Sequence, residues 1–232
     1  EWAREGGTVE NVIPILKLRA SANGINSTLK NITIGYNGSA GLSNITSVSA
    51  VNSTGKKWTK TNISQKVFNL TVNDSIENYK NITLKLGISS NATANLETVD
   101  LNVSEIHGVN VSLPQPPVDP NGKTKLDTKK PDIESIAAPQ EDANISGGIL
   151  AAADYNDGES GTEYGRWFLK RNGNDVYVDG LLYQKTIGQF GSVGRLESSK
   201  NYKVIFEVKD KVGHYASKSV DINIDNVDPE IV

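Results

Sequence analysis

Asparagine followed two residues later by serine or threonine recurs along the chain. This tripeptide, the sequon, accepts N-linked sugars on the asparagine side-chain nitrogen. Twelve of the sixteen asparagines before residue 114 head a sequon, where the local Ser and Thr content predicts roughly three or four by chance. The candidate glycosylation sites are Asn26, Asn31, Asn37, Asn44, Asn52, Asn62, Asn69, Asn73, Asn81, Asn91, Asn102, Asn110 and Asn144.

Several sequons lie on strands in a way that places their polar ends in water. Residues Asn81–Leu86 alternate polar and apolar side chains, so Asn81 and Thr83 share one face and the apolar residues share the other. The sequons at Asn69, Asn102 and Asn110 repeat this arrangement. Exposed strands favour threonine but are poor in asparagine. The pattern therefore favours true sugar acceptors over a merely polar strand face.

An acidic loop offers a second kind of chemistry. Asp154, Asn156, Asp157 and Glu159 surround Gly158 and supply closely spaced oxygen ligands. Such a set can hold Ca²⁺, although the spacing departs from the EF-hand loop. The alternative is a solvated acidic turn. We expect no cofactor other than Ca²⁺ at this loop.

The remaining reactive residues do not form a catalytic set. His107 and His214 are the two histidines, one in each half of the chain, and cysteine is absent. There is no G-x-S-x-G elbow and no phosphate-binding glycine motif. The sequence predicts that the protein is not an enzyme. Hydrolysis by the acidic loop remains a remote alternative.

Aromatic side chains could instead form a platform on which sugar rings stack. The candidate residues are Trp58, Tyr155, Tyr164, Trp167, Tyr177 and Tyr183. The alternative is ordinary core and cross-strand packing, and we expect Trp167 to fill a core.

Composition restricts the partners. The net charge is −3 and no Lys/Arg run is present, which argues against nucleic acid. No apolar stretch of about 20 residues occurs, so no membrane insertion is expected. The first residues do not resemble a signal peptide, and methionine is absent. We expect a processed or excised piece of an extracellular, cell-surface protein.

Short strands separated by Gly, Asn and Ser predict an all-β fold. The expected strands are Val12–Ser21, Leu29–Tyr36, Ile45–Val51, Val67–Val72, Asn81–Ile88, Thr98–Val103, Val109–Leu113, Asp132–Ala138, Ile145–Ala153, Tyr164–Lys170, Val176–Val178, Leu181–Thr186, Tyr202–Val208 and Tyr215–Ile224. About seven strands per hundred residues is typical of an Ig-like sandwich. The predicted fold is two tandem Ig-like β-sandwich domains joined by a Pro-rich linker.

Prolines set the expected boundaries. Pro114, Pro116, Pro117 and Pro120 interrupt any sheet ladder. We expect a heavily glycosylated sandwich at 8–113, the linker at 114–125, and a second Ig-like sandwich at 126–226.

A short repeat suggests continuation of the chain. The pattern Asp, three residues, Pro, acid, Ile occurs at 127–133 and again at 225–231. Its 98-residue spacing is that of one Ig-like domain with its linker. We therefore expect 227–232 to begin a following domain. Chance recurrence of an Asp/Pro turn is the alternative.

Four segments give the chain a family resemblance. Residues 12–22, 29–34 and 88–94 resemble β-sandwich modules of archaeal surface proteins and adhesins. Residues 202–213, with their Asp-x-x-Gly turn, resemble the late strand of bacterial or archaeal Ig-like surface modules. The resemblance implies a role in a surface layer, a filament or adhesion.

The expected function is a structural component of an extracellular cell-surface assembly, either a surface layer or a filament, glycan-coated and non-catalytic. The expected partners are other copies of the chain in a lattice or filament, together with covalent N-glycans. The alternative is a cell-surface adhesin or carbohydrate-binding module on an Ig-like stalk.

Overall fold

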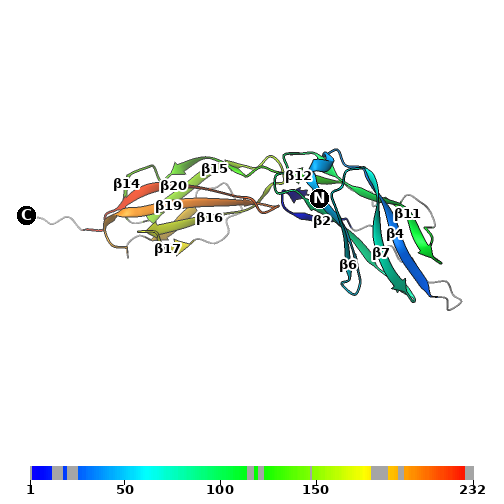
Figure 1. Ribbon diagram of the computed structural model, residues 1–232. Helices are drawn as coiled ribbons and strands as arrows, with labels where there is room; N and C mark the ends of the chain where they lie inside the picture. The colour runs from blue at the N-terminus through cyan, green and yellow to red at the C-terminus, as the bar shows by residue number, and fades with distance from the viewer. Residues whose placement is uncertain are drawn as a thin grey trace, which may run out of the picture. The chain divides into compact units, whose positions relative to one another are not determined.

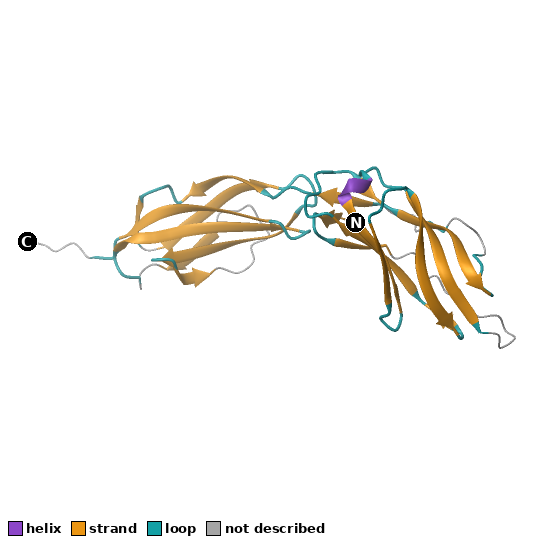
Figure 2. Ribbon diagram, viewed as in Figure 1, coloured by secondary structure: helices purple, strands orange, loops and turns teal. Residues whose placement is uncertain are grey.

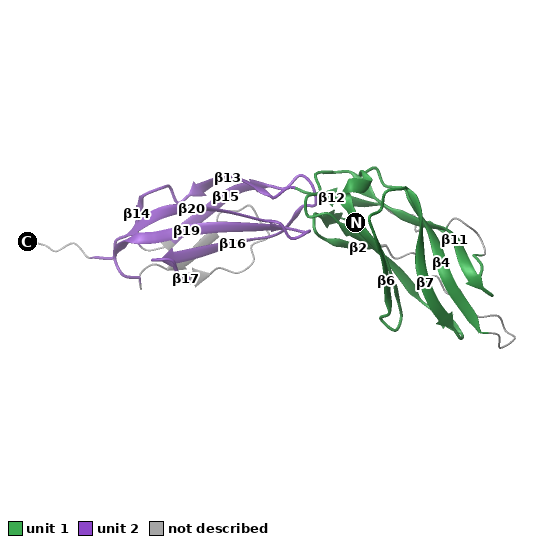
Figure 3. Ribbon diagram, in the orientation of Figure 1, with its two compact units in different colours: residues 1–128 green, residues 129–232 purple. Residues whose placement is uncertain are grey.

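The structure is a computed structural model that describes residues 2–11, 18–19, 26–113, 118–119, 123–146, 148–178, 188–192 and 196–227. Strands dominate these residues, and their only helical element is the 3-10 turn η1 (Leu42–Asn44) (Figures 1 and 2). The chain divides into two compact units, residues 1–128 and 129–232 (Figure 3).

Unit 1 is a β-sandwich. Its described strands are β1 (Trp2–Arg4), β2 (Thr8–Asn11), β3 (Leu18–Arg19), β4 (Ser27–Tyr36), β5 (Ile45–Asn52), β6 (Lys57–Thr61), β7 (Val67–Ile76), β8 (Tyr79–Lys80), β9 (Ile82–Ile88), β10 (Thr98–Val99), β11 (Leu101–Val109) and β12 (Thr124–Asp127). Two sheets, ordered β11-β4-β7 and β2-β9-β5-β6, form its layers, while β1-β12-β10 and β3-β8 make small additional sheets.

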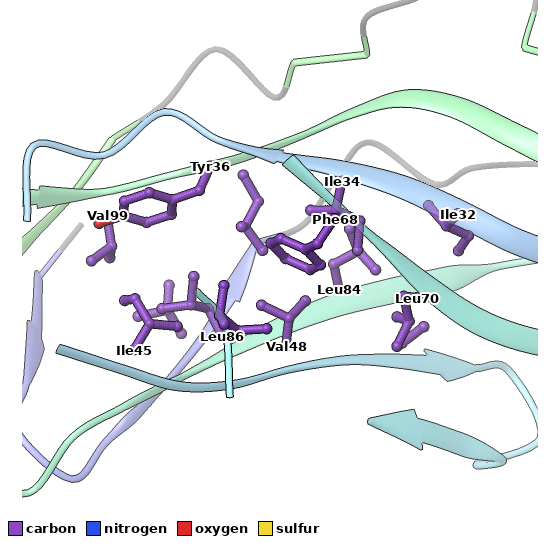
Figure 4. Close-up of a cluster of buried hydrophobic side chains, with 14 of the residues drawn as sticks. Ile32, Ile34, Tyr36, Ile45, Val48, Phe68, Leu70, Leu84, Leu86 and Val99 are labelled. Atoms are coloured by element: carbon purple, nitrogen blue, oxygen red, sulfur yellow. The ribbon is translucent and has the colours of Figure 1, made fainter. Parts of the chain in front are cut away.

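The unit 1 core forms because its strands alternate with a period of two. In β7 every second residue is buried, and in β9 the apolar residues are buried while their neighbours are half-buried. Figure 4 shows Ile34 and Phe68, from the first sheet, opposite Val48 and Leu84 from the second. The two sheets therefore close over one apolar layer.

Unit 2 is a second β-sandwich. Its described strands are β13 (Asp132–Ala138), β14 (Ala143–Ile145), β15 (Gly148–Asn156), β16 (Thr162–Arg171), β17 (Asn174–Val178), β18 (Gly188–Ser192), β19 (Ser199–Asp210) and β20 (Tyr215–Ile224). The sheets are ordered β13-β15-β18 and β14-β20-β19-β16-β17. These two sandwiches confirm the predicted all-β fold class.

Aromatic rings fill the unit 2 core. Trp167 in β16 is 3% exposed and lies 4.7 Å, ring centre to ring centre, from Phe206 in β19. Phe206 in turn lies 5.2 Å from Tyr155 in β15. The rings are tilted at 45° and 41°, geometries that aromatic pairs favour. Trp167 thus packs in the core as predicted.

The predicted domain boundary is wrong by several residues. Thr124 and Lys125, assigned to the linker, belong to β12, and Leu126, assigned to the second domain, is buried in the unit 1 core. The cause is that the alternating segment Thr124–Asp127 resumes strand structure after the prolines, and it pairs with β1 and β10. Residues Trp2–Arg4 likewise belong to unit 1 rather than preceding it.

Most predicted strands that fall in the described residues are present. Residues 111–113 are not in a strand, because β11 ends at Val109. Several observed strands were not predicted, among them β1, β2, β6, β12 and β18. Residues 114–117, 120–122, 181–186, 228–232 and most of 12–21 lie outside the described residues. The predicted linker prolines and following domain fall within them.

Gly108 provides a first test of the packing of β11 against β4. A Cβ added there would lie 1.9 Å from the carbonyl oxygen of Thr28, which is fixed backbone. Gly108→Ala should therefore destabilise unit 1 by about 1–3 kcal/mol, as overpacking does. Gly41→Ala is the control, since its added Cβ would meet ordinary contacts at 3.6 Å. Thermal melting of both variants measures the difference, and equal melting temperatures would contradict this geometry.

Candidate functional site

The β11-β4-β7 sheet, here called the sequon sheet, carries sequons within its strands, on the outer face of the sandwich. Asn31 lies in β4, Asn69 and Asn73 in β7, and Asn102 in β11. Asn69 and Asn73 are exposed, while Asn31 and Asn102 are half-buried. The residues between acceptor and hydroxyl point inward, and all are buried: Ile32, Leu70, Asp74 and Val103. This alternation agrees with the predicted orientation of the sequons at Asn69 and Asn102, whereas Asn81 precedes β9 and Asn110 follows β11, so neither lies within a strand.

Two of these sequons pair with each other across adjacent strands. Asn31 lies opposite Thr71, and Thr33 lies opposite Asn69. The Thr33 hydroxyl donates a hydrogen bond of 2.8 Å to Asn69 Oδ1. Because neighbouring strands are about 4.8 Å apart, sugars on both asparagines would cover the same part of the sheet.

Other sequon asparagines lie at turns and strand ends. Asn26, Asn37, Asn62, Asn91 and Asn110 are exposed, and Asn44 is half-buried at the end of η1. Three sequon asparagines have positive φ: Asn62 at 56°, Asn73 at 48° and Asn110 at 56°. Asparagine tolerates this left-handed conformation better than most residues. At these three positions the backbone supplies a second reason for asparagine.

Asn52 differs from the other acceptors because its side chain is buried, with 5% exposure. Its nitrogen donates to Asp74 Oδ2 at 3.0 Å. Asp74 is also 4% exposed and accepts from Lys80 Nζ at 3.1 Å. Sequence analysis did not identify this polar cluster. A signal was present, since Asp74 occupies the apolar row of β7.

Two further sequon asparagines, Asn81 and Asn144, have surroundings unlike those of the others. Asn81 is half-buried, and its Oδ1 has no hydrogen-bond partner. Asn144, the one sequon of unit 2, is exposed in β14, and its Oδ1 accepts from Asn223 Nδ2 at 3.1 Å.

The β2-β9-β5-β6 sheet, here called the opposite sheet, has a different outer face. One cross-strand row of that face consists of Glu10, Lys85, Ser49 and Thr59. Glu10 and Lys85 form an ion pair, and Ser49 lies 2.9 Å from the Thr59 hydroxyl. Among the described residues, its one sequon asparagine within a strand is the buried Asn52. Among the described residues of unit 1, the sequon asparagines that lie in strands and point outward therefore belong to the sequon sheet.

A shallow groove of about 400 Å³ lies at one end of the sequon sheet. Its lining residues are Gly35, Tyr36, Asn37, Lys66, Val67, Asn102 and Ser104. Two of these, Asn37 and Asn102, are sequon asparagines. Sugars at both positions would lie over the groove, so we assign it no small-molecule ligand.

The three carboxylates of the predicted Ca²⁺ loop do not form one oxygen cluster. Asp154 and Asn156 are exposed in β15. Asp157 accepts hydrogen bonds of 3.4 Å from the Glu159 backbone and from Ser160, and Glu159 pairs with Lys129 at 3.1 Å. Asp154, Asp157 and Glu159 do not bring carboxylate oxygens to the mutual separation that a shared cation requires.

The two histidines have different environments. His107 is exposed in β11, with Nε2 3.0 Å from Glu105 Oε2 and 3.4 Å from the Thr33 hydroxyl. His214 is in the β19–β20 turn, with Nδ1 2.7 Å from Asp210 Oδ2. His214 is buried, with 6% exposure.

The aromatic residues proposed as a sugar platform do not gather on one surface. Trp167 and Tyr155 are in the core, and Trp58 is half-buried against the unit 1 core. Tyr164 is half-buried in β16, with Arg166 at 5.5 Å and Lys209 at 5.7 Å from its ring centre. Tyr183 and the side chain of Tyr177 lie outside the described part of the structure.

Asp100 gives a testable pH effect. Burial raises the pKa of its carboxyl, and Asp119 raises it further, against opposing effects of the Leu101 backbone and Lys123. The folded state therefore binds this proton more tightly than the unfolded state. The contribution to stability is present below the ordinary carboxyl range and is lost as pH rises through the folded pKa.

Asp100→Asn should accordingly raise the melting temperature of unit 1 at pH 7 and leave it nearly unchanged at pH 3. The buried Oδ1 of Asp100 lacks a hydrogen-bond partner, which agrees with the cost of the charged form. Glu77→Gln, at an exposed carboxylate of the same unit, is the control. A variant that melts lower than the parent at pH 7 would refute this assignment.

The comparisons with known proteins give no family. No protein-family model matches the chain, and no curated protein matches it. The fibronectin(III)-like modules of Clostridium thermocellum CbhA are similar at 13% identity and TM-score 0.38, with 97% of this chain and 88% of that chain covered.

Two other solved structures are more distant. The first two Ig domains of DIP-gamma give 12% identity and TM-score 0.29, with 95% and 91% of the two chains covered. A β-1,2-glucanase from Parabacteroides distasonis gives 11% identity and TM-score 0.22, with 88% of this chain and 28% of that chain covered. TM-scores this low carry no functional argument. In the described part of the chain, no helix has the length and apolarity needed to cross a membrane.

Proposed function

We propose that the chain is a structural, non-catalytic component of an extracellular cell-surface assembly, a surface layer or filament of the kind found on archaea. The observation that carries the proposal is the density of sequons in unit 1 and their outward orientation on the sequon sheet. Sugars there would make this face bulky and hydrophilic. The sugar-covered face would then separate the cell-surface assembly from its surroundings.

The opposite sheet supports the proposal that the chain assembles with other protein molecules. Its cross-strand row of Glu10, Lys85, Ser49 and Thr59 is polar and has no sequon, and Ser49 is buried within it. A protein partner can approach this row closely, because none of its four residues is a sequon asparagine. Other copies of the chain are the proposed partners. An adhesin that binds a foreign glycan is the competing function. Against it, the Arg166 and Lys209 side chains lie near the Tyr164 ring, so the ring is not left open for a sugar to stack on.

Native protein tests the sugar coat directly. Its intact mass should exceed the 25.0 kDa of the polypeptide by several oligosaccharides. Glycopeptides should include Asn31, Asn69, Asn73 and Asn102. Thr71→Ala should remove one oligosaccharide, because it destroys the Asn69 sequon without changing Asn69. Thr59→Ala, an exposed threonine of the opposite sheet, is the matched control and should leave the sugar mass unchanged. A native mass equal to the bare polypeptide would falsify the proposal.

Electron microscopy tests the assembly. Purified glycoprotein should form sheets or filaments. Persistent monomers that bind a glycan on an array at micromolar strength would support the adhesin instead.

A further inference from the structure

A carboxylate interrupts the apolar row on the inward side of β7. Its neighbours in this row are buried: Phe68, Leu70, Val72 and Ile76. Asp74 is nearly as buried, and it lies where the ends of β5 and β8 meet β7. Asn52 is the last residue of β5, and Lys80 is the last residue of β8. The fold thus gathers an amide, the Lys80 amine and a carboxylate in a largely water-excluded place, while the more exposed Lys56 amine lies 3.8 Å from Asp74 Oδ1.

One oxygen of Asp74 accepts hydrogen bonds from both nitrogen groups. Asp74 Oδ2 accepts a hydrogen bond of 3.0 Å from Asn52 Nδ2 and one of 3.1 Å from Lys80 Nζ. The carboxylate can therefore exchange protons with the lysine amine and with the amide nitrogen without moving. This is the placement required of a general acid–base group that serves two nitrogens.

The carbonyl of Asn52 is polarised from its other side. Asn52 Oδ1 accepts three hydrogen bonds, from Thr54 N at 3.0 Å, from Thr54 Oγ1 at 2.8 Å and from Lys56 N at 2.9 Å. Two fixed backbone donors and one hydroxyl are aimed at the oxygen that becomes negative when the carbonyl carbon is attacked. The arrangement has the form of an oxyanion hole.

We infer that Asn52 and Lys80 are joined by an intramolecular amide bond whose formation Asp74 catalyses. Asp74 first takes a proton from Lys80 Nζ. The freed lone pair attacks Asn52 Cγ, and the carbonyl electrons move to Oδ1, where the three donors stabilise them. Asp74 then donates this proton to Nδ2 and takes a second proton from the attacking nitrogen. The Cγ–Nδ2 bond breaks as the carbonyl reforms, and ammonia leaves, carrying the second proton away from Asp74 as ammonium.

The net reaction is amine plus amide giving a new amide plus ammonia. It needs no oxidant, reductant or added reactant, and each chain performs it once on itself. The product ties the end of β5 to β8 in a chain that has no cysteine for disulfides. The reaction consumes the same Asn52 nitrogen that glycosylation would use. Asn52 can therefore carry the cross-link or a sugar, but not both.

The test uses the full chain made in a host without N-glycosylation. Its intact mass should be lower than the polypeptide mass by one ammonia, about 17 Da. A succinimide at Asn52 would lose the same mass, so a proteolytic digest must decide. A branched peptide with Asn52 Cγ joined to Lys80 Nζ is the expected result. Tandem mass spectrometry identifies both ends.

Variants test the assigned roles. Asp74→Asn and Lys80→Arg should each restore the full polypeptide mass and abolish the branched peptide. Lys57→Arg, an exposed lysine in β6, is the control and should retain both signatures. If a variant fails to fold, the branched peptide of the parent chain still decides. The inference is overturned by a parent chain of full mass, by a succinimide, by linkage to Lys56 in place of Lys80, or by a native glycopeptide at Asn52.

Discussion

Trp167→Ala should lower the stability of unit 2 by about 3–5 kcal/mol, the usual cost of removing a large buried aromatic side chain. Trp167 is nearly fully buried and contacts Phe206, which also contacts Tyr155. The variant loses apolar burial and one side of this aromatic stack, and the rigid sheet backbone cannot close the resulting cavity. Domains are stable by only about 5–15 kcal/mol, so the loss is a large fraction of the total.

Differential scanning calorimetry measures this effect. A loss of this size in a domain of about 100 residues lowers the melting temperature by at least 12 °C. Tyr215→Ala is the matched control, because Tyr215 is an aromatic residue of the same sheet but is 47% exposed. The control should shift melting by only a few degrees. Equal shifts for the two variants would show that Trp167 does not hold the core.

The second large effect concerns the β19–β20 turn, which the sequence identified by its Asp-x-x-Gly pattern. Asp210 Oδ1 accepts backbone hydrogen bonds from Val212 at 2.9 Å, Gly213 at 2.6 Å and His214 at 2.8 Å. Asp210 Oδ2 pairs with the His214 ring. Gly213 has φ of +99°, a conformation that suits glycine. One carboxylate thus fixes the turn that joins the neighbouring strands β19 and β20 of unit 2.

Asp210→Ala should cost about 2–4 kcal/mol, because three charge-assisted bonds disappear and their backbone donors lose an acceptor. Asp210→Asn should cost less, since an amide oxygen can still accept from the backbone. Asp154→Ala, an exposed aspartate in β15, is the control and should change stability by less than about 0.5 kcal/mol. Urea titration of the three variants gives the order. An Asp210→Ala variant as stable as the control would contradict this account of the turn.

The strands were predictable because alternation is a local property of the sequence. Tyr215–Ile224 and Asp132–Ala138 have the predicted bounds. Lys57–Thr61 was missed because its two lysines and two threonines flank a single aromatic residue, and its pairing with β5 supplies what the sequence lacks. The boundary was placed too early because four prolines are a stronger local signal than the short alternating segment that follows them.

The candidate sites divide in the same way. Outward strand sequons follow from local alternation, so Asn69 and Asn102 were oriented correctly. The cluster of Asn52, Asp74 and Lys80 depends on three strand ends meeting in space, which no local pattern encodes. For the same reason, the sequence could not distinguish the buried Asn52 from the exposed sequon asparagines. An aspartate in an apolar row was the one local indication of that cluster.

The reciprocal pairing of the sequons on β4 and β7 has a consequence for how the chain folds. A slip of one residue between these strands would turn Asn31 or Asn69 inward and expose Ile32 or Leu70. An asparagine without an attached sugar could be buried in such a misfolded state at a moderate cost in free energy. An oligosaccharide, in contrast, cannot fit between two packed sheets. Sugars attached before folding would therefore exclude every odd-numbered slip of β4 against β7. The coat would then guide the sandwich to its native pairing as well as cover it.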